Sequence, residues 1–238
     1  MPEPNAFSQT LALFTPIHKD GYKFVAAAIA VTVIAFLISS ILGLLCLAAA
    51  IVITFFFRDP QRVVPSREGL IVAPADGTII SIGTASSPQE LGFGGEPRTR
   101  ISIFLSVLDV HVTRAPAGGR IEASVYRPGM HYNAAAAEAP ALNESHAFAI
   151  ETKDAVRLGV VLVAGTVARR IVTPVKEGDA VEAGERLGII RFGSRVDVYL
   201  PVSPPPPLLV AEGQRTVAGE TVIADLGLTG ERRVFRRI

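Results

Sequence analysis

The sequence predicts a mainly β domain, built as a β-sandwich or a barrel-like core, that follows an apolar helical segment near the N-terminus. Two observations predict this division. Residues 24–57 contain no charged side chain, whereas the rest of the 238-residue chain is an ordinary mixture that is rich in Gly and Pro. After Pro60, short β-branched runs alternate with Gly and Pro, which is typical of strands joined by turns. We therefore expect an N-terminal cytoplasmic segment at 1–23, a membrane anchor at 24–57 and a β-rich domain at 58–238.

The apolar segment is too long for one straight membrane span. Its roughly 34 residues would make about 50 Å of helix, whereas the core of a bilayer is about 30 Å thick. Ser39, Ser40 and Gly43 lie near its middle, so we expect a helical hairpin, with one long tilted span as the alternative. Basic residues flank the segment on both sides: Lys19, Lys23, Arg58 and Arg62. The positive-inside rule then places both flanks in the cytoplasm, which a hairpin allows and a single span does not.

A cleaved signal peptide is a poor fit to the same segment. The apolar core of a signal peptide has at most about 15 residues and is followed by a small-x-small cleavage site, and this segment has neither property. The single cysteine, Cys46, lies inside the apolar stretch, so the chain cannot form an intrachain disulfide. Nothing in the sequence suggests an oxidising compartment.

Short runs in the remainder of the chain predict strands. These runs are 70–72, 78–82, 100–105, 120–125, 147–151, 157–163, 169–173, 186–191 and 197–200. Residues 134–141 could form one or two turns of helix, which Pro140 would end. The connections 86–97 and 129–143 exceed the usual length, so we expect them to be mobile or to face a substrate.

Residues 174–188 carry a turn signature. Gly178 and Gly184 are six residues apart, each beside an acidic residue, which suits tight turns on either side of a short strand. The segment resembles the hairpin of biotinyl and lipoyl carrier domains, although Lys176 has no Met-Lys-Met type tip around it. A membrane-anchored adaptor or binding module is therefore one alternative function. Such an adaptor normally carries a coiled-coil hairpin, and this chain has no heptad run.

Four segments, taken together, resemble one enzyme family. They are FFFRDPQR at 55–62, APADG at 73–77, LSVLDVHVTRAP at 105–116 and FGS at 192–194. Each motif alone has low specificity, but their order and spacing resemble the short bacterial, membrane-bound form of phosphatidylserine decarboxylase over nearly the whole chain.

The resemblance implies a proenzyme that cuts its own Gly193–Ser194 bond. The products would be a β chain, 1–193, and an α chain, 194–238, which form a heterodimer, and Ser194 would become a covalent pyruvoyl group. This group would form a Schiff base with the amine of phosphatidylserine, which loses carbon dioxide and leaves as phosphatidylethanolamine. A lipid substrate agrees with a membrane anchor, and the flanking charges place the catalytic domain on the cytoplasmic side of the inner membrane.

Self-cleavage requires a base, because a serine hydroxyl is a weak nucleophile until its proton is removed. His111 is the one histidine in a family motif, and an unperturbed pKa of about 6.5 suits proton transfer near neutral pH. Asp76 would hold the tautomer of His111 and stabilise its imidazolium, as in a serine hydrolase triad. Gly193 has no Cβ and can adopt the strained turn that this attack needs. The alternatives are a structural histidine at 111 and a plain Asp-Gly turn at Asp76.

The chain departs from longer family members at two positions. Arg114 stands where many of them carry a second histidine, so His111 is the one histidine of the motif for both self-cleavage and the later protonation. The leader before the serine is Phe192-Gly193, where Leu-Gly or Gly-Gly is common.

A last polar cluster, Asn143-Glu144-Ser145-His146, could line the headgroup site through Asn143 and His146, with an ordinary loop as the alternative. No histidine, cysteine or acidic group has metal-ligand spacing, and nothing suggests nucleic-acid binding. The sequence leaves open whether the protein forms a homo-oligomer and whether a sibling decarboxylase acts on a different amine.

Overall fold

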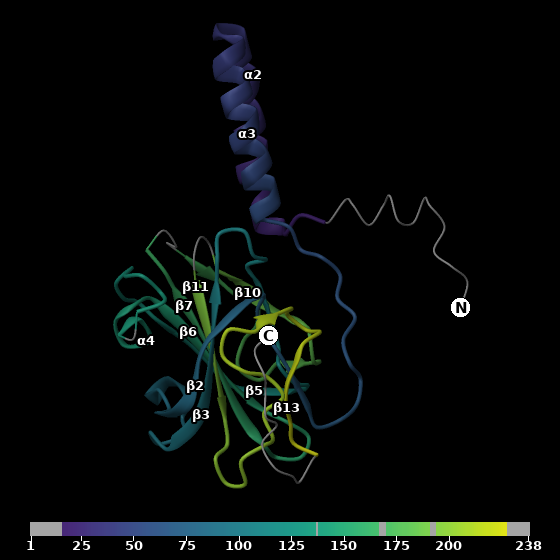
Figure 1. Cartoon of the computed structure of the whole chain (residues 1–238), viewed down its shortest axis with the longest axis vertical. Helices are drawn as coiled ribbons and strands as arrows, with labels where there is room; N and C mark the ends of the chain where they lie inside the picture. The colour runs from purple at the N-terminus through teal and green to yellow at the C-terminus, as the bar shows by residue number, and fades with distance from the viewer. Residues whose placement is uncertain (1–15, 137, 167–169, 191–193, 228–238) are drawn as a thin grey trace, which may run out of the picture. The chain divides into compact units, whose positions relative to one another are not determined.

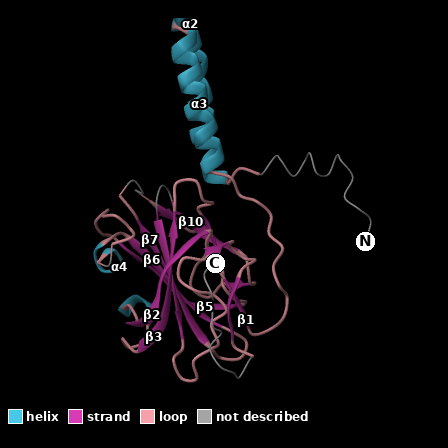
Figure 2. Cartoon of the chain, in the orientation of Figure 1, coloured by secondary structure: helices cyan, strands magenta, loops and turns pink. Residues whose placement is uncertain are grey.

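A computed structural model describes residues 16–136, 138–166, 170–190 and 194–227. The chain divides into two compact units, Met1–Gln61 and Arg62–Ile238. Figure 2 shows that the first unit is helical and that the second consists mainly of strands. The predicted fold class, a β-rich domain preceded by an apolar helical segment, is confirmed.

The first unit contains two apolar helices, α2 (Tyr22–Ile38) and α3 (Ser40–Phe56), preceded by the short 3₁₀ helix η1 (Lys19–Gly21). The helices lie side by side in Figure 1. Ser39 separates them with an extended backbone (φ −160°, ψ 134°), so the chain reverses direction there. Gly43 allows the close packing, because a Cβ at this position would lie 2.3 Å from the ring of Phe36. The stretch Lys19–Ile38 is long and apolar enough to cross a membrane, while α3 is shorter.

Among its described residues, the second unit holds the strands and two short helices. The strands are β1 (Leu70–Val72), β2 (Gly77–Ser86), β3 (Pro97–Leu105), β4 (Val112–Arg114), β5 (Gly119–Arg127), β6 (Ser145–Glu151), β7 (Arg157–Ala164), β8 (Ile171–Val172), β9 (Ala180–Val181), β10 (Arg186–Ile190), β11 (Ser194–Leu200), β12 (Arg215–Thr216) and β13 (Val222–Asp225). The helices are η2 (Gln89–Leu91) and α4 (Ala139–Leu142).

Eight strands form one curled antiparallel sheet in the order β12-β2-β3-β11-β7-β6-β5-β9. β11 lies in its middle and pairs with β3 on one side and with β7 on the other. A second sheet has the order β4-β10-β8, and β1 pairs with β13. Every one of these pairs is antiparallel, so the fold needs no crossover helix.

Each face of the large sheet packs into its own hydrophobic cluster. Successive strand residues point to opposite faces, and β11 follows this rule: Val196 and Val198 belong to the larger cluster, the main core, whereas Tyr199 belongs to a smaller one, the outer cluster. Leu91 and Phe93, from the connection 86–97, are buried in the outer cluster. That connection therefore covers the outer face of the sheet. The sequence predicts that it is mobile or faces a substrate.

Two predicted elements differ in detail. The predicted helix at 134–141 was expected to end at Pro140, but α4 starts at Ala139 with Pro140 in its first turn, where no N–H needs an intrahelical partner. Gly178 and Gly184 have φ values of 90° and 78° and flank β9, as the turn signature predicts. β9 pairs with β5, and β10 pairs with β4 and β8, so these two strands lie in different sheets.

Candidate active site

Ser194 is the first residue of β11, at one end of the large sheet. It lies in register with Leu105 of β3 and with Ala164 of β7. The alternation along β11 directs its side chain towards the main core, the face to which Leu105 and Ala164 also belong. Ser194 is 0% exposed, and its Oγ has no hydrogen-bond partner among the described residues. Since a buried hydroxyl without a partner costs about 1–3 kcal/mol, this one calls for an explanation.

Gly193, the other half of the predicted cut, lies outside the described residues together with 191 and 192. The chain that leads to it is held beside His111, because the N–H of Ile190, the last residue of β10, donates to the carbonyl of His111 at 3.1 Å. Ser194 follows four residues later, at most about 14 Å away along an extended chain. The backbone thus brings His111 and Ser194 to the same end of the sheet.

The ring of His111 is fully buried, and its Nδ1 lies 2.9 Å from the backbone carbonyl oxygen of Asp109. A carbonyl oxygen can only accept a hydrogen bond, so Nδ1 must carry the proton. In the neutral ring, Nε2 is then the nitrogen that can accept a proton, which is the state that a general base needs. The carbonyl of Asp109 therefore orients the ring at its Nδ1 side.

The turn that carries this carbonyl is itself anchored. The carboxylate of Asp109 accepts from the N–H of Ser106 at 2.8 Å and from Arg215 of β12. Burial acts to raise the pKa of the Asp109 carboxyl, but hydrogen bonds from Arg215 and Ser106 and the charge of Arg215 outweigh burial and lower the pKa. Asp109 is thus a carboxylate at neutral pH, and it ties the segment before His111 to β12.

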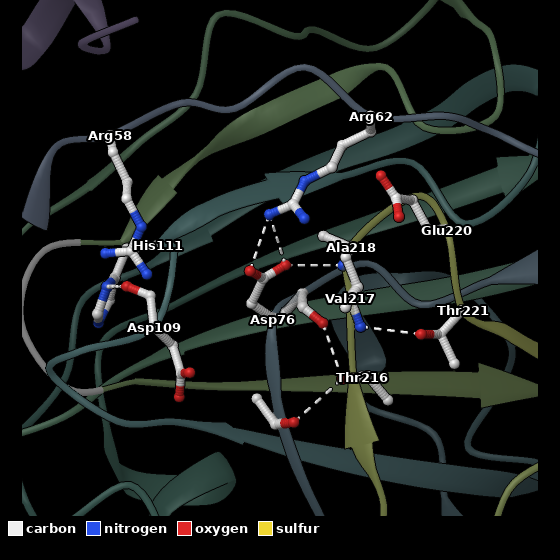
Figure 3. Close-up of polar contacts among 12 residues, drawn as sticks. Arg58, Arg62, Asp76, Asp109, His111, Thr216, Val217, Ala218, Glu220 and Thr221 are labelled. Carbon is white, nitrogen blue, oxygen red and sulfur yellow. Dashed lines mark hydrogen bonds and ion pairs between the residues drawn. The ribbon is translucent and has the colours of Figure 1, made fainter. Parts of the chain in front are cut away.

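Asp76 lies just before β2 and has a different set of partners (Figure 3). Its two oxygens accept from one guanidinium nitrogen of Arg62 at 2.9 and 2.8 Å, and Oδ1 also accepts from the N–H of Ala218 at 2.8 Å. These hydrogen bonds join Asp76 to the start of the β unit and to the segment after β12. In this structure, the Nδ1 partner of His111 is the carbonyl of Asp109, so the predicted support of Asp76 for His111 does not run through that nitrogen.

Asn143 borders the position of Ser194 on the side of β7. Its Nδ2 donates to the carbonyls of Ala164 and Tyr132, both at 2.8 Å, and its Oδ1 accepts from the N–H of Tyr132 at 3.0 Å. The side chain is fully buried and closes the connection 129–143 onto the end of β7.

Glu144 was inside the predicted polar cluster but was not singled out. Its carbonyl accepts from the N–H of Ala164, so the β6–β7 register continues to this residue and places it on the face of Ser194. Its carboxylate accepts from the N–H of Ile171 at 3.1 Å and lies 3.2 Å from Nε2 of His131. Its position between Asn143 and His146 is the one feature of the sequence that points to Glu144. A single acidic residue does not by itself show that its side chain is buried in a site.

His146 lies on β6, on the same face as Phe148 of the main core, with its ring stacked on Phe148 at 4.6 Å. Its Nε2 is 2.9 Å from the Oγ of Ser124, and burial lowers the pKa of His146 to about 4. The ring is therefore neutral at pH 7 and can take part in hydrogen bonds without carrying a charge.

Comparisons with known proteins agree on one family. A sequence model described as phosphatidylserine decarboxylase matches residues 49–224. The chain is 51% identical over 223 residues to the phosphatidylserine decarboxylase proenzyme of Azorhizobium caulinodans, covering 94% of each chain. Its identity to the proenzyme of the same name from Xanthobacter autotrophicus is 49% over 223 residues, again 94% of each. The proenzyme of that name from Cereibacter sphaeroides is 51% identical over 218 residues, 92% of this chain and 93% of its own.

Proposed function

Because this chain belongs to the phosphatidylserine decarboxylase family and is a carboxy-lyase, we propose that it cuts its own Gly193–Ser194 bond and converts phosphatidylserine into phosphatidylethanolamine. The observation that carries the proposal is the hydroxyl of Ser194, which is buried and has no partner within the part of the chain that the structure describes. A serine whose function is to be consumed has no need of a permanent hydrogen bond.

The self-cleavage follows from the groups at this end of the sheet. Nε2 of His111 takes the proton of the Ser194 hydroxyl, and Oγ attacks the carbonyl carbon of Gly193. The peptide C–N bond then breaks, which leaves an ester and an amine on residue 194. Loss of the α-hydrogen of residue 194 breaks the Cβ–Oγ bond and frees the carboxylate of Gly193. Water then replaces the nitrogen, which leaves as ammonia, and a ketone remains at residue 194.

His111 is the base in this proposal because its Nδ1–H is committed to the carbonyl of Asp109. Asp76 remains part of the proposed site as a carboxylate that binds Arg62 and the N–H of Ala218. Ala218 belongs to the proposed α chain, so Asp76 joins the two products of the cut.

A pyruvoyl group fits the surroundings of residue 194. Its formation replaces the hydroxymethyl side chain by a methyl group, which suits a face lined by Leu105 and Ala164 and removes a hydroxyl without a partner among the described residues. When present, this group supplies an electrophilic carbonyl for a substrate amine and an electron sink for the loss of carbon dioxide.

Asn143 and His146 are proposed to line the headgroup side of the site. Asn143 supports this through its hydrogen bond to Ala164, the register partner of Ser194. His146 faces the same core as Ser194 but two strands away, and it would act as a neutral hydrogen-bonding group.

Membrane association is supported by the apolar helices. We propose that α2 and α3 form a hairpin in the cytoplasmic membrane, with the β unit on the cytoplasmic side, where basic residues flank the apolar segment. The amine headgroup of the substrate lies at the same interface.

The test uses the full-length protein purified in detergent. We expect two fragments on a denaturing gel, and the smaller one should begin at residue 194. Its mass should be lower, by one ammonia, than that of a 194–238 fragment that still begins with serine. Ser194→Ala should remain intact. Ser87→Ala is the matched control, because Ser87 is also a buried serine whose Oγ has no partner in the described ranges. A wild-type chain that decarboxylates while intact, or a Ser194→Ala chain that is still cut, would refute the proposal. Incubation with phosphatidylserine and with free serine identifies the amine substrate.

A further inference from the structure

A buried ion pair lies on β11 directly after Ser194. Arg195 is 2% exposed and Asp197 is 0% exposed. The Nε of Arg195 donates to Oδ1 of Asp197 at 2.6 Å. One terminal nitrogen of Arg195 donates to the Oγ of Ser102 on β3 at 2.9 Å, and the other donates to the carbonyl of Ala136 at 3.4 Å. Arg195 is therefore attached to its own strand, to a neighbouring strand and to the connection 129–143.

The ion pair lies on the opposite face of the sheet from the hydroxyl of Ser194. Successive residues of a strand alternate between faces, and Tyr199, which shares the face of Arg195 and Asp197, packs in the outer cluster. The guanidinium therefore does not reach a substrate that is attached at residue 194. Any contribution of Arg195 to the reaction must act through the position of the backbone.

Stability alone does not account for this pair. A buried ion pair is often no more stabilising than apolar side chains of similar size, because both charges lose their hydration. This pair is also incompletely bonded, since Oδ2 of Asp197 is buried and has no partner among the residues described. What such a pair does provide is a fixed geometry, because few arrangements satisfy a buried guanidinium.

A fixed geometry matters most at a chain end. In the uncut chain, Ser194 is held by covalent bonds on both sides. After the proposed cut it becomes the first residue of the α chain, where pairing with β3 and β7 holds the backbone but where a strand frays most readily. Arg195 is the residue next to that new chain end, and its side-chain hydrogen bonds hold it in place.

We propose that Arg195, held by Asp197 and Ser102, is a positioning residue that keeps residue 194 in place once the chain is cut. The inference rests on the proposed self-cleavage. It assigns Arg195 a role after the cut, when the carbonyl formed at residue 194 must remain where the substrate amine reaches it.

The decisive variant is the double substitution Arg195→Met/Asp197→Leu, because it removes both charges and leaves neither buried alone. Its matched control is Arg157→Met/Glu122→Leu, which removes an ion pair of 2.5 Å between β7 and β5. Arg157 lies at the opposite end of β7 from Ala164, the register partner of Ser194. Each protein is examined by fragment mass, by hydrazide labelling of the ketone, by hydrogen exchange of the α chain and by steady-state kinetics.

We expect the double variant to be cut and to carry the ketone. Its amides at 195–197 should exchange about tenfold faster than those of the wild type. Its kcat should fall about 10- to 100-fold with little change in KM, because a displacement of about 1 Å can cost 100-fold in rate. The control pair should keep wild-type exchange and kcat, and Arg195→Lys, which can retain the ion pair, should recover part of the loss.

The inference would be overturned if the double variant kept both the wild-type rate of hydrogen exchange at 195–197 and the wild-type kcat. A folded double variant that is not cut would also overturn it, because Arg195 would then act before cleavage. Should the double variant not fold, Ser102→Ala removes a single attachment; unchanged exchange at 195–197 in that variant contradicts the inference, and faster exchange supports it. An intact wild-type chain overturns the proposed function itself, and it is seen before any variant is made.

Discussion

Replacing His146 with glutamine should make the protein less sensitive to mild acid. The His146 ring is only 7% exposed, and burial lowers its pKa to about 4, whereas a histidine in an unfolded chain has a pKa of about 6.5. Between these two values the unfolded chain binds more protons than the folded one, so stability rises with pH. The contribution of neutral His146 is thus complete above about pH 6.5 and is lost as the pH falls towards 4.

The two pKa values set the size of the effect. They correspond to a loss of about 2 kcal/mol in the free energy of unfolding at pH 5. The loss reaches at most about 3 kcal/mol at a pH well below 4. For a chain of this size, 1 kcal/mol shifts Tm by about 2–4 °C. Between pH 8 and pH 5, the Tm of a protein that keeps His146 should therefore fall by about 4–8 °C more than that of His146→Gln.

The measurement is thermal unfolding in detergent, followed by circular dichroism in a Ser194→Ala background so that each sample is a single uncut chain. Ser124→Ala is the control, because it removes the hydrogen-bond partner of His146 but keeps the ring, and burial is the cause of the lowered pKa. It should retain the acid sensitivity of its parent. Equal losses of Tm in His146→Gln and its parent would refute the reasoning.

Three further predictions concern the opposite side of the site. His111→Gln should leave the precursor uncut at neutral pH, as judged by fragment mass, and normal cleavage would remove His111 from the role of base. Arg62→Met should lower the free energy of unfolding by about 1–3 kcal/mol, because it leaves the carboxylate of Asp76, whose side chain is 14% exposed, with one N–H donor; an unchanged Tm would contradict this. Gly77→Ala should cost at least about 1–3 kcal/mol, since its Cβ would lie 2.2 Å from the carbonyl oxygen of Phe104, and wild-type Tm would show that β2 and β3 can separate there.

Much of the fold could be predicted from local patterns. The apolar segment and its polar centre at Ser39 predicted two helices that turn back on each other, because hydrophobic length and a break in pattern are local properties. Most strands were likewise visible as β-branched runs between Gly and Pro. The start of β11 was not. Arg195 and Asp197 look like solvent-facing residues, and their burial depends on partners that are distant in sequence, Ser102 and Ala136.

Sequence motifs nominated residues for the candidate site but did not predict their contacts. The motifs singled out His111, Asp76 and Ser194, and the backbone brings His111 and Ser194 to the same end of the sheet. The partner of Nδ1 of His111 is the carbonyl of Asp109, and a backbone carbonyl leaves no mark in a sequence because every residue has one. Asp76 binds Arg62 and Ala218, and nothing in the composition of either segment marks that pairing.

The central place of β11 has a consequence for the lifetime of a cut molecule. β11 is hydrogen-bonded along both edges, so the proposed α chain can dissociate only if the pairings of β11 with β3 and with β7 both break. The fragments would stay joined for as long as the sheet survives. Once the sheet has melted, however, restoring it would require two separate polypeptides to meet, and recovery would depend on their concentration. The precursor can renature as a single chain, whereas the mature form would persist through slow unfolding rather than through easy refolding.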